Sequence, residues 1–270
     1  MNTLNEAACK NNNCFSDTFN LYAAYYDLLY ADKDYKAESD YIESIINKHG
    51  SNVGSILDLG CGTGIHALML AKKGFYIHGV DISSNMIEQA KQKMEQNFAI
   101  KKSLKFDVGD IRGLDLNSKF DAVVSIFHVI SYLTTNCDIH SFFATAAHHL
   151  NKDGLLIFDF WYGPAVLTQK PIVKIKRLEN NDLRVTRISE PESHLNENVI
   201  DVNFHIFAQS KMDNQINDFK EIHKMRYFFK PELEMFAAHG GFEILNFEEW
   251  LTGIQPNEQS WGACVICKKI

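Results

Sequence analysis

One short segment, residues 55–64 with the sequence SILDLGCGTG, constrains the fold of this chain more than any other. An apolar run reaches the acid Asp58, and Gly60, Gly62 and Gly64 then follow at every second position before the helical pattern IHALMLAKK begins. Glycines at this spacing let the backbone turn sharply and let a ligand approach the main chain beside the free N–H groups of a helix start. The segment therefore predicts a strand, a tight glycine turn and a helix, an arrangement that fits several nucleotide-binding folds.

The segments that follow alternate between strand and helix patterns. Residues 120–127 form a nearly continuous apolar run, which is typical of a buried strand in a parallel sheet. Alternation of this kind predicts an α/β fold, a Rossmann-like, doubly wound sheet with helices on both faces. The other predicted strands are 76–80, 104–108 and 155–158, the predicted helices are 65–73, 85–97 and 139–150, and a turn is expected at 151–154.

The pattern changes between residues 171 and 229. Every second residue of 200–206 is apolar, which is typical of a strand with one buried face. We predict an antiparallel β-sheet inserted at about 171–229, because the helix pattern at 232–239 and two further strands then complete the first sheet. Residues 19–270 are therefore expected to form a single domain, and residues 1–18 a flexible N-terminal segment.

The charge balance and the distribution of apolar residues limit the partners. The formal net charge is −7 and no basic block is present, which disfavours nonspecific binding to nucleic acid. No apolar stretch approaches the length needed to span a membrane, and the first residues do not resemble a signal peptide. We therefore expect a cytoplasmic protein with neither nucleic acid nor membrane as a partner.

The cysteines give no sign of a metal or redox site. Cys264-x-x-Cys267 lies in an alternating stretch, where residues three apart point to opposite faces of a strand, and no second pair completes a tetrahedral site. We expect buried thiols there and predict no metal. The remaining cysteines are scattered as free thiols would be, at Cys9, Cys14, Cys61 and Cys137.

Polar residues follow the predicted parallel strands at the point where each ends. Ligands of such sheets bind beyond the carboxyl ends of the strands, so these residues should converge on one crevice. Asp81 ends the second strand at about the distance from the glycine turn that suits a pair of ribose hydroxyls. The other converging segments are 58–64, 110–111, 128–132 and 159–162.

The D-L-G-C-G-T-G sequence, with Asp81 downstream, resembles the first motif of class I methyltransferases that depend on S-adenosylmethionine (SAM). The resemblance implies that SAM is the cofactor and S-adenosylhomocysteine the product. It implies that main-chain atoms of the glycine loop contact the amino-acid end and the sugar of SAM. Asp81 would accept hydrogen bonds from the ribose hydroxyls, and Asp110 from the adenine amino group. Ile82 and Ile111 would enclose the base. The expected cofactor-binding residues are Tyr26, Tyr35, Asp58, Gly60, Cys61, Gly62, Gly64, Asp81, Ile82, Met86, Asp110 and Ile111.

A narrower resemblance rests on five features taken together. They are YYDLLY and DKDY near the start, GDIRGL, SIFHVISYL and the β insertion. This combination looks like the bacterial N,N-dimethyltransferases that act on nucleotide-linked amino sugars. The resemblance implies that Tyr26 lies beside cofactor and acceptor, and that Tyr35 is the tyrosine of the second element. Tyr132 stands where some members have histidine, and tyrosine, with a pKa near ~10, is a poorer base. His128, one turn earlier, could substitute. The catalytic candidates are thus His128, Tyr132 and Tyr26.

Three functions stay open from the sequence. The first is methylation of a small molecule, expected to be the amine of a nucleotide-linked amino sugar. The second is O-methylation of a sugar or small metabolite with His128 as the base, since a hydroxyl needs more help than a neutral amine. The third is a SAM-binding module without catalysis. A nucleic-acid methyltransferase is disfavoured because no N/D-P-P-Y/F element follows the fourth strand. The expected partners are a small-molecule acceptor and a second copy of the chain in a homodimer.

Overall fold

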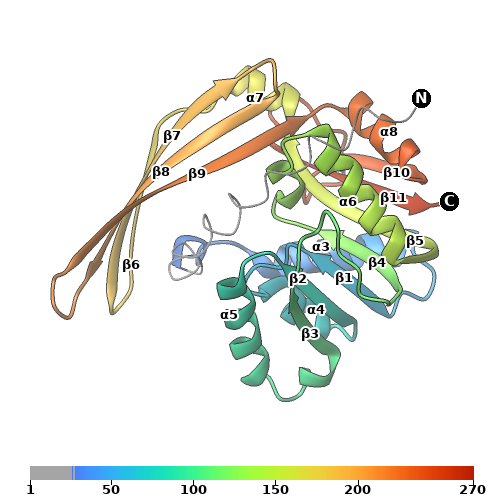
Figure 1. Ribbon diagram of the computed structural model, residues 1–270, viewed down its shortest axis with the longest axis horizontal. Helices are drawn as coiled ribbons and strands as arrows, with labels where there is room; N and C mark the ends of the chain where they lie inside the picture. Colours follow the sequence, from blue (N-terminus) through green and yellow to red (C-terminus); the bar gives the residue numbers. More distant parts are fainter. Residues whose placement is uncertain (1–25, 27) are drawn as a thin grey trace.

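The computed structural model describes residue 26 and residues 28–270 (Figure 1). The segment predicted to be flexible, residues 1–18, lies outside the described residues, as does the start of the predicted domain at residue 19. The rest of the chain is an α/β fold with a mixed sheet, and this confirms the predicted fold class.

The main sheet has five parallel strands in the order β3-β2-β1-β4-β5, and two antiparallel strands extend it beyond β5. β11 pairs with β5 and β10 pairs with β11, so the last two strands complete the first sheet as predicted. The strands are β1 (Ser55–Leu59), β2 (Tyr76–Asp81), β3 (Leu104–Val108), β4 (Phe120–Ser125), β5 (Leu150–Tyr162), β10 (Phe242–Glu249) and β11 (Gly262–Lys269).

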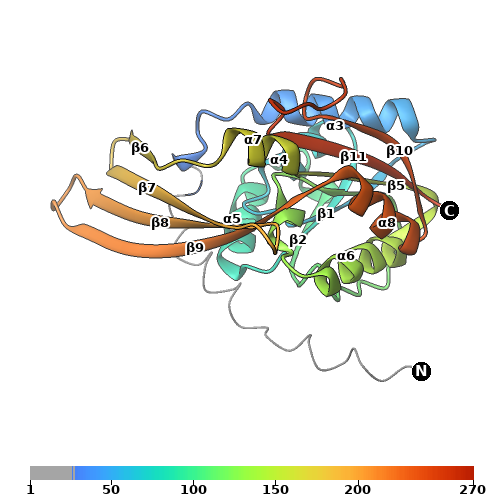
Figure 2. The same ribbon diagram turned by 90° about the horizontal axis from the view of Figure 1, so that it is seen from above.

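Helices cover both faces of this sheet (Figure 2). α3, α4 and α5 pack on one face and α6 and α8 on the other. Side-chain caps define several helix starts: Ser83 accepts from the N–H of Met86 at the start of α5, and Thr135 accepts from that of Asp138 at the start of α6. The helices are α3 (Tyr35–His49), α4 (Ile65–Lys72), α5 (Ser84–Glu95), α6 (Asn136–His149), α7 (Gly163–Gln169) and α8 (Lys230–His239), with short 3-10 turns η1 (Lys101–Ser103) and η2 (Val129–Tyr132).

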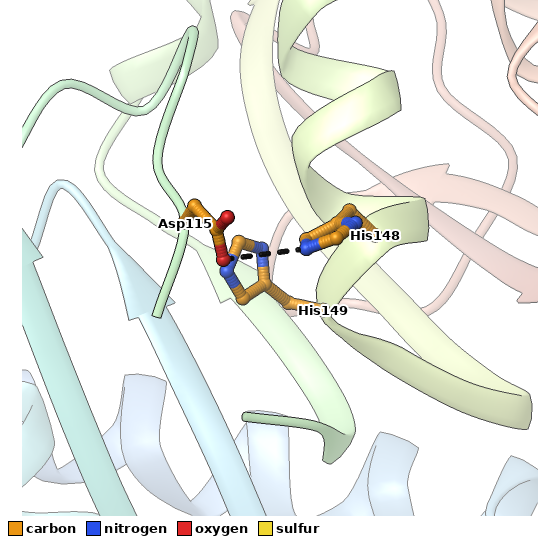
Figure 3. A group of neighbouring side chains, drawn as sticks. All are labelled: Asp115, His148 and His149. Carbon is orange, nitrogen blue, oxygen red and sulfur yellow. Dashed lines mark ion pairs between the residues drawn. The ribbon is translucent and has the colours of Figure 1, made fainter. Parts of the chain in front are cut away.

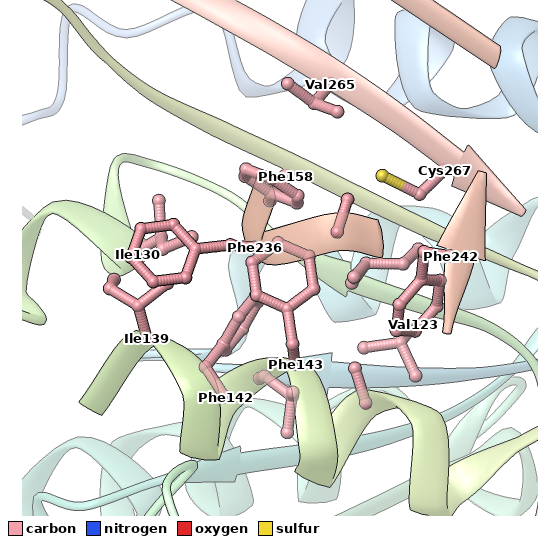
Figure 4. Packing of buried hydrophobic residues seen from close by; sticks show 14 of the residues in the cluster. Val123, Ile130, Ile139, Phe142, Phe143, Phe158, Phe236, Phe242, Val265 and Cys267 are labelled. Carbon is pink, nitrogen blue, oxygen red and sulfur yellow. The ribbon is translucent and has the colours of Figure 1, made fainter. Parts of the chain in front are cut away.

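Two apolar clusters, one on each face, hold the layers together. Under α6 and α8 the rings of Phe142, Phe143 and Phe158 meet edge to face, a favourable arrangement for aromatic side chains (Figure 4). Cys267 lies in this cluster and Cys264 in the other, so the two thiols are buried on opposite faces of β11 as predicted.

The prediction of free thiols was wrong at one position. Cys137 is disulfide-bonded. Its partner is none of the other described cysteines, because Cys61, Cys264 and Cys267 are free. Spacing along the sequence carries no information about which cysteines pair, whereas the burial of an isolated thiol in a strand can be predicted from its apolar neighbours.

The insertion is a long antiparallel ribbon, called here the β extension, which projects from the parallel sheet (Figures 1 and 2). At its base Trp161 and Tyr162 of β5 pair with Tyr227 and Phe228, so the extension continues the main sheet. At its flank Leu29 packs in a cluster with side chains of the extension and of α5. The extension consists of β6 (Lys174–Glu179), β7 (Leu183–His194), β8 (Val199–Ser210) and β9 (Ile216–Phe228).

Two boundaries differ from the prediction. β4 ends at Ser125, because Phe127 and His128 both have positive φ, +72° and +60°, and the chain leaves the sheet there. β5 begins at Leu150 and runs through the expected turn at 151–154, with Asp153 at φ +63° and an irregular register opposite β4. In the described part of the chain, no helix has the length and apolar character that crossing a membrane requires.

Candidate active site

A cavity of about 440 Å³ lies at the carboxyl ends of the parallel strands and reaches the β extension. Its volume falls within the usual range for small-molecule sites. The topology therefore brings the polar segments that end β1, β2 and β4 to one place, as the parallel sheet predicts. Of the predicted site residues, those that line the cavity are Tyr26, Tyr35, Asp58, Gly60, Cys61, Gly62, Asp81, Ile82, Met86, Asp110, Ile111, His128 and Tyr132.

Gly64 is the predicted site residue that the cavity does not include. Its φ is +77°, and a Cβ there would lie 2.9 Å from Ala90 and from Phe106. Gly64 thus allows α4 to start close to its neighbours, which is a packing requirement, and its contact with the cofactor stays a prediction. Gly60 is constrained in the same way, because its φ is +82° and a Cβ would come within 2.5 Å of Val129.

The N–H groups of the glycine loop are largely occupied within the protein. Gly60 and Cys61 donate to the carbonyl of Val80, at 2.8 and 3.0 Å, and Gly62 donates to Asp81 Oδ2 at 2.9 Å. Carbonyl oxygens have two lone pairs, so the loop can still accept hydrogen bonds from a ligand. Cys61 itself is inert, because burial first, then Asp58 and Asp81, raise the pKa of its thiol.

Asp58, at the end of β1, is a buried carboxyl group 1% exposed, and neither of its oxygens has a hydrogen-bond partner among the described residues. Burial, and then the charge of Asp81, raise the pKa of Asp58 to about 7. An unpartnered acid in this position costs free energy unless a ligand supplies a donor or a positive charge. The buried carboxyl group of Asp58 at the end of β1 therefore favours the binding of a cationic ligand.

Asp81 closes β2 and supports the glycine loop. Its Oδ1 accepts from the N–H of Ser83 and its Oδ2 from that of Gly62, both at 2.9 Å. Burial raises the pKa of Asp81 although these two hydrogen bonds oppose the shift. A carboxylate has about four lone-pair sites, so two remain for a pair of ligand hydroxyls.

Asp110, after β3, is held by Arg112, which sequence reasoning missed. The guanidinium contacts both Asp110 oxygens, at 2.6 to 3.0 Å, and also reaches Asp138 of α6 at 3.1 Å. Burial favours a higher pKa for Asp110, but the hydrogen bonds from Arg112 outweigh it and the pKa is lowered. Asp110 is thus a charged acceptor whose orientation is set by Arg112, and any amino group that it binds must share its oxygens.

On the opposite wall His128 is held by Asp159 of β5. Asp159 is 1% exposed; its Oδ1 accepts from the backbone N–H of His128 at 3.0 Å, and its Oδ2 lies 2.8 Å from His128 Nδ1. His128 and Tyr132 both reach the cavity, but each has its own partner, since the Tyr132 hydroxyl lies 2.8 Å from His223 Nδ1. The positive φ values of Phe127 and His128 are a local strain of the kind found at functional sites.

Comparison with known proteins identifies the chemistry. A family model described as a methyltransferase domain matches residues 56–154, which include the glycine loop, Asp81 and Asp110. A protein of Streptomyces venezuelae named dTDP-3-amino-3,4,6-trideoxy-alpha-D-glucopyranose N,N-dimethyltransferase is 26% identical over 86% of this chain and 92% of its own length. The chain is a SAM-dependent methyltransferase. Its fold agrees, because the crystal structure of Streptomyces venezuelae DesVI matches with a TM-score of 0.76 and 24% identity, over 92% of this chain and 98% of that one.

Two further relatives bear on what this methyltransferase acts on. One, of Streptomyces fradiae, is named dTDP-3-amino-3,6-dideoxy-alpha-D-glucopyranose N,N-dimethyltransferase and is 25% identical over 82% of this chain and 84% of its own length. The other, YqeM of Bacillus subtilis, is 29% identical over 88% of this chain and 92% of its own length, and its name gives no acceptor.

The residues of the methyltransferase fit SAM at its charged end. SAM carries a protonated α-amino group and a positive sulfur, and the unpartnered Asp58 is the buried anion that such a ligand would satisfy. Asp81 has lone pairs left for the ribose hydroxyls, and Ile82 and Ile111 line the cavity where they could enclose the base. We propose these residues as the SAM contacts.

SAM affinity is expected to rise with pH up to about 7. Asp58 binds a cation as the carboxylate, so below its pKa of about 7 the protein must release a proton when SAM binds. The SAM amino group stays protonated in this range, and the dissociation constant should fall by up to about tenfold per pH unit. Calorimetry from pH 5.5 to 8 measures this, with Asp58→Asn as the control that loses most of the slope. Equal slopes for both proteins would remove Asp58 from the cofactor site.

Sequence reasoning missed an ion-pair network beside the cofactor end. Glu38 of α3 lies 2.8 Å from Lys33 Nζ and 2.6 Å from Nε2 of His66, and His66 lines the cavity. Although burial favours a higher pKa, these two partners lower the pKa of Glu38 to about 2. Lys33 also lies 3.4 Å from the centre of the Phe127 ring. The polar character of residues 32–35 was the available signal.

The β extension contributes part of the cavity wall, including Arg187, Phe204 and His223. On β9 Glu221 and His223 are buried and the apolar Ile222 between them is exposed, which only the structure reveals. Buried polar side chains on a strand indicate a role other than packing in the hydrophobic core.

A separate group of possible metal ligands lies near the end of α6, formed by Asp115, His148 and His149 (Figure 3). His149 cannot serve as a ligand in this arrangement, because its Nε2 accepts from the N–H of Leu116 at 3.1 Å and its Nδ1 lies 2.8 Å from the carbonyl of Thr145. Both nitrogens are therefore used in joining the chain segments, and the group is a structural one.

Proposed function

We propose that the enzyme methylates the amine of a nucleotide-linked amino sugar. The proposal is supported by the names of the two Streptomyces relatives, which align over most of this chain at 25% and 26% identity. A cytoplasmic location and a homodimer stay predictions.

One observation carries the proposal: the cavity that Asp81 lines also has a wall from the β extension, which contains the cations Lys174 and Arg187. The protein has a net charge of −7, so two cations in this wall are a local feature that suits an acidic acceptor such as a diphosphate. Tyr26, Trp161 and other aromatic residues also line the cavity, and their faces suit a sugar ring.

The residues around the acceptor would act mainly by holding it. When bound, SAM supplies a methyl group on a positively charged sulfur. Much of the rate can come from keeping the acceptor nitrogen in line with that methyl group, which is a task for the aromatic walls. His128, held through Asp159, is the side chain suited to take the proton that the nitrogen gives up after each transfer.

Matched acceptors test the proposal. The protein is incubated with SAM and one of three compounds: a dTDP-linked amino sugar, the same sugar nucleotide with a hydroxyl in place of the amine, and the amino sugar without its nucleotide. Mass spectrometry follows the methylated product. We expect methylation of the first compound and little of the other two. Transfer to the hydroxyl compound alone would contradict the proposal.

O-methylation is the second candidate, and one observation favours it. The Asp159–His128 pair is the arrangement that activates a hydroxyl, because the carboxylate orients Nδ1 and leaves Nε2 as the base. The hydroxyl compound is the direct test of this candidate. A failure of the wild-type enzyme on every one of these compounds, with SAM still bound, would contradict both candidates.

A further inference from the structure

Three polar side chains on the acceptor side form a hydrogen-bonded chain of side chains, and the proposed function gives none of them a role. The Tyr132 hydroxyl, at the end of η2, lies 2.8 Å from Nδ1 of His223. Nε2 of the same imidazole lies 3.2 Å from Oε2 of Glu221, two residues earlier on β9. Tyr132 and His223 both line the cavity, so the chain runs from the β extension to the acceptor space.

The burial of this chain is costly for an ordinary strand. Glu221 and His223 are 8% and 3% exposed, whereas Ile222 between them is 51% exposed. Glu221 Oε1 has no hydrogen-bond partner among the described residues. Burying polar groups incompletely paired while exposing an apolar one lowers stability, so a packing role alone does not account for the arrangement.

Other charged and aromatic groups enclose the imidazole from neighbouring elements. The ring of Phe204 on β8 lies 4.7 Å from that of His223. The guanidinium of Arg187 on β7 stacks 4.5 Å from the Phe204 ring, and its Nη1 lies 3.5 Å from the hydroxyl of Tyr30. Glu221 and Tyr132 contact the imidazole directly, and Tyr30, Arg187 and Asp81 act electrostatically on Tyr132.

When the imidazole is neutral, the acid at one end sets the direction of the hydrogen bonds. A carboxylate only accepts, so Nε2 of a neutral His223 must carry its proton toward Glu221. Nδ1 then holds a lone pair, and the Tyr132 hydroxyl must donate to it. Burial raises the pKa of Tyr132 further above its usual value, so the group remains a phenol. Tyr132 lines the cavity, and with its proton given to Nδ1 its oxygen acts there only as an acceptor.

We infer that Glu221 and His223 are positioning residues that commit Tyr132 to accept a hydrogen bond from the N–H of the acceptor amine. This inference rests on the proposed amine acceptor. With one N–H held by Tyr132, the nitrogen lone pair stays free to meet the methyl group. A monomethylated amine keeps one N–H, so the same contact serves a second transfer.

The first test needs no acceptor. In protein with 15N-labelled histidine, the ring nitrogen shifts identify the tautomer, and the His223 signals are assigned by their loss in His223→Gln. We expect a neutral His223 with its proton on Nε2 in the wild type. In Glu221→Gln the amide can donate to Nε2, and the proton should move to Nδ1. A wild-type proton on Nδ1 would overturn the inference whatever the substrate is.

The second test uses the amino sugar nucleotide that the wild type methylates. Tyr132→Phe removes only the hydroxyl, and Glu221→Gln removes the acid that orients His223. Each is expected to raise the KM for the acceptor about tenfold, with kcat and the SAM dissociation constant little changed. Lys220→Gln, an exposed change on the same strand, is the matched control. Thermal unfolding checks that each variant folds, and Tyr132→Phe remains available should the β9 variants fail.

The two proposals fail in different ways. If the wild type methylates no amine, the proposed function is wrong, and the inferred contact with an amine falls with it, even with the expected tautomer. If the wild type methylates the amine but Tyr132→Phe and Glu221→Gln keep the wild-type KM, the inference is overturned and the proposed function stands.

Discussion

Asp81→Ala is expected to bind SAM roughly 5- to 150-fold more weakly than the wild type, a loss of about 1–3 kcal/mol. Asp81 is buried and holds the N–H groups of Gly62 and Ser83, and we propose that its remaining lone pairs accept from the ribose hydroxyls. Alanine therefore removes the ligand contacts and also loosens the glycine loop. Calorimetry at pH 8, where Asp58 is ionised, measures the dissociation constant.

Two further variants separate these effects. Asp81→Asn keeps the shape and one acceptor oxygen, so its affinity should lie between those of Asp81→Ala and the wild type. Asp107, at the end of the neighbouring strand β3, pairs with His78 and does not line the cavity, so Asp107→Ala should bind SAM as the wild type does. An Asp81→Ala protein with unchanged affinity would show that the ribose lies elsewhere.

His128→Ala is expected to lower the turnover number about a hundredfold, the lower end of what a general base contributes, without a matching loss of SAM affinity. Asp159 holds both the backbone N–H and Nδ1 of His128, so the imidazole presents Nε2 to the cavity. Single-turnover rates with the methylated acceptor, beside calorimetry with SAM, give the two quantities. Added imidazole should restore part of the activity of His128→Ala.

His128→Asn is the matched control for the backbone. His128 has φ +60°, a conformation that asparagine tolerates better than alanine, and the asparagine amide can still donate to Asp159. We expect it to fold as the wild type and to be as slow as His128→Ala. Wild-type turnover in His128→Asn would make His128 a structural residue that fixes the end of β4.

The parallel sheet and the cofactor end of the cavity could be predicted because their signals are local. Asp58 and the glycines lie within one short segment, and Asp81 and Asp110 each follow a strand directly. Once the strands are parallel, their carboxyl ends share one edge of the sheet, so these residues must converge. The predicted strand 120–127 extends past the end of β4, because the apolar side chain of Phe127 continues the strand pattern although its backbone has already left the sheet.

The acceptor side could not be predicted to the same depth. The insertion was recognisable as antiparallel strands, yet nothing in its spacing said that β9 buries Glu221 and turns His223 toward a cavity built by the parallel sheet. The same applies to Arg112, whose neighbour Asp110 was visible but whose contact with Asp138 depends on the packing of α6.

By itself the sequence determined the strand–glycine–helix unit, the order of alternating elements and the carboxylates at the strand ends, because each depends on residues a few positions apart. Only the tertiary structure decided the partners of the acceptor side. His128 meets Asp159 across 31 positions and Tyr132 meets His223 across 91 positions. The first contact forms only when β4 and β5 lie side by side, and the second only when β9 packs against η2. No local pattern encodes either arrangement.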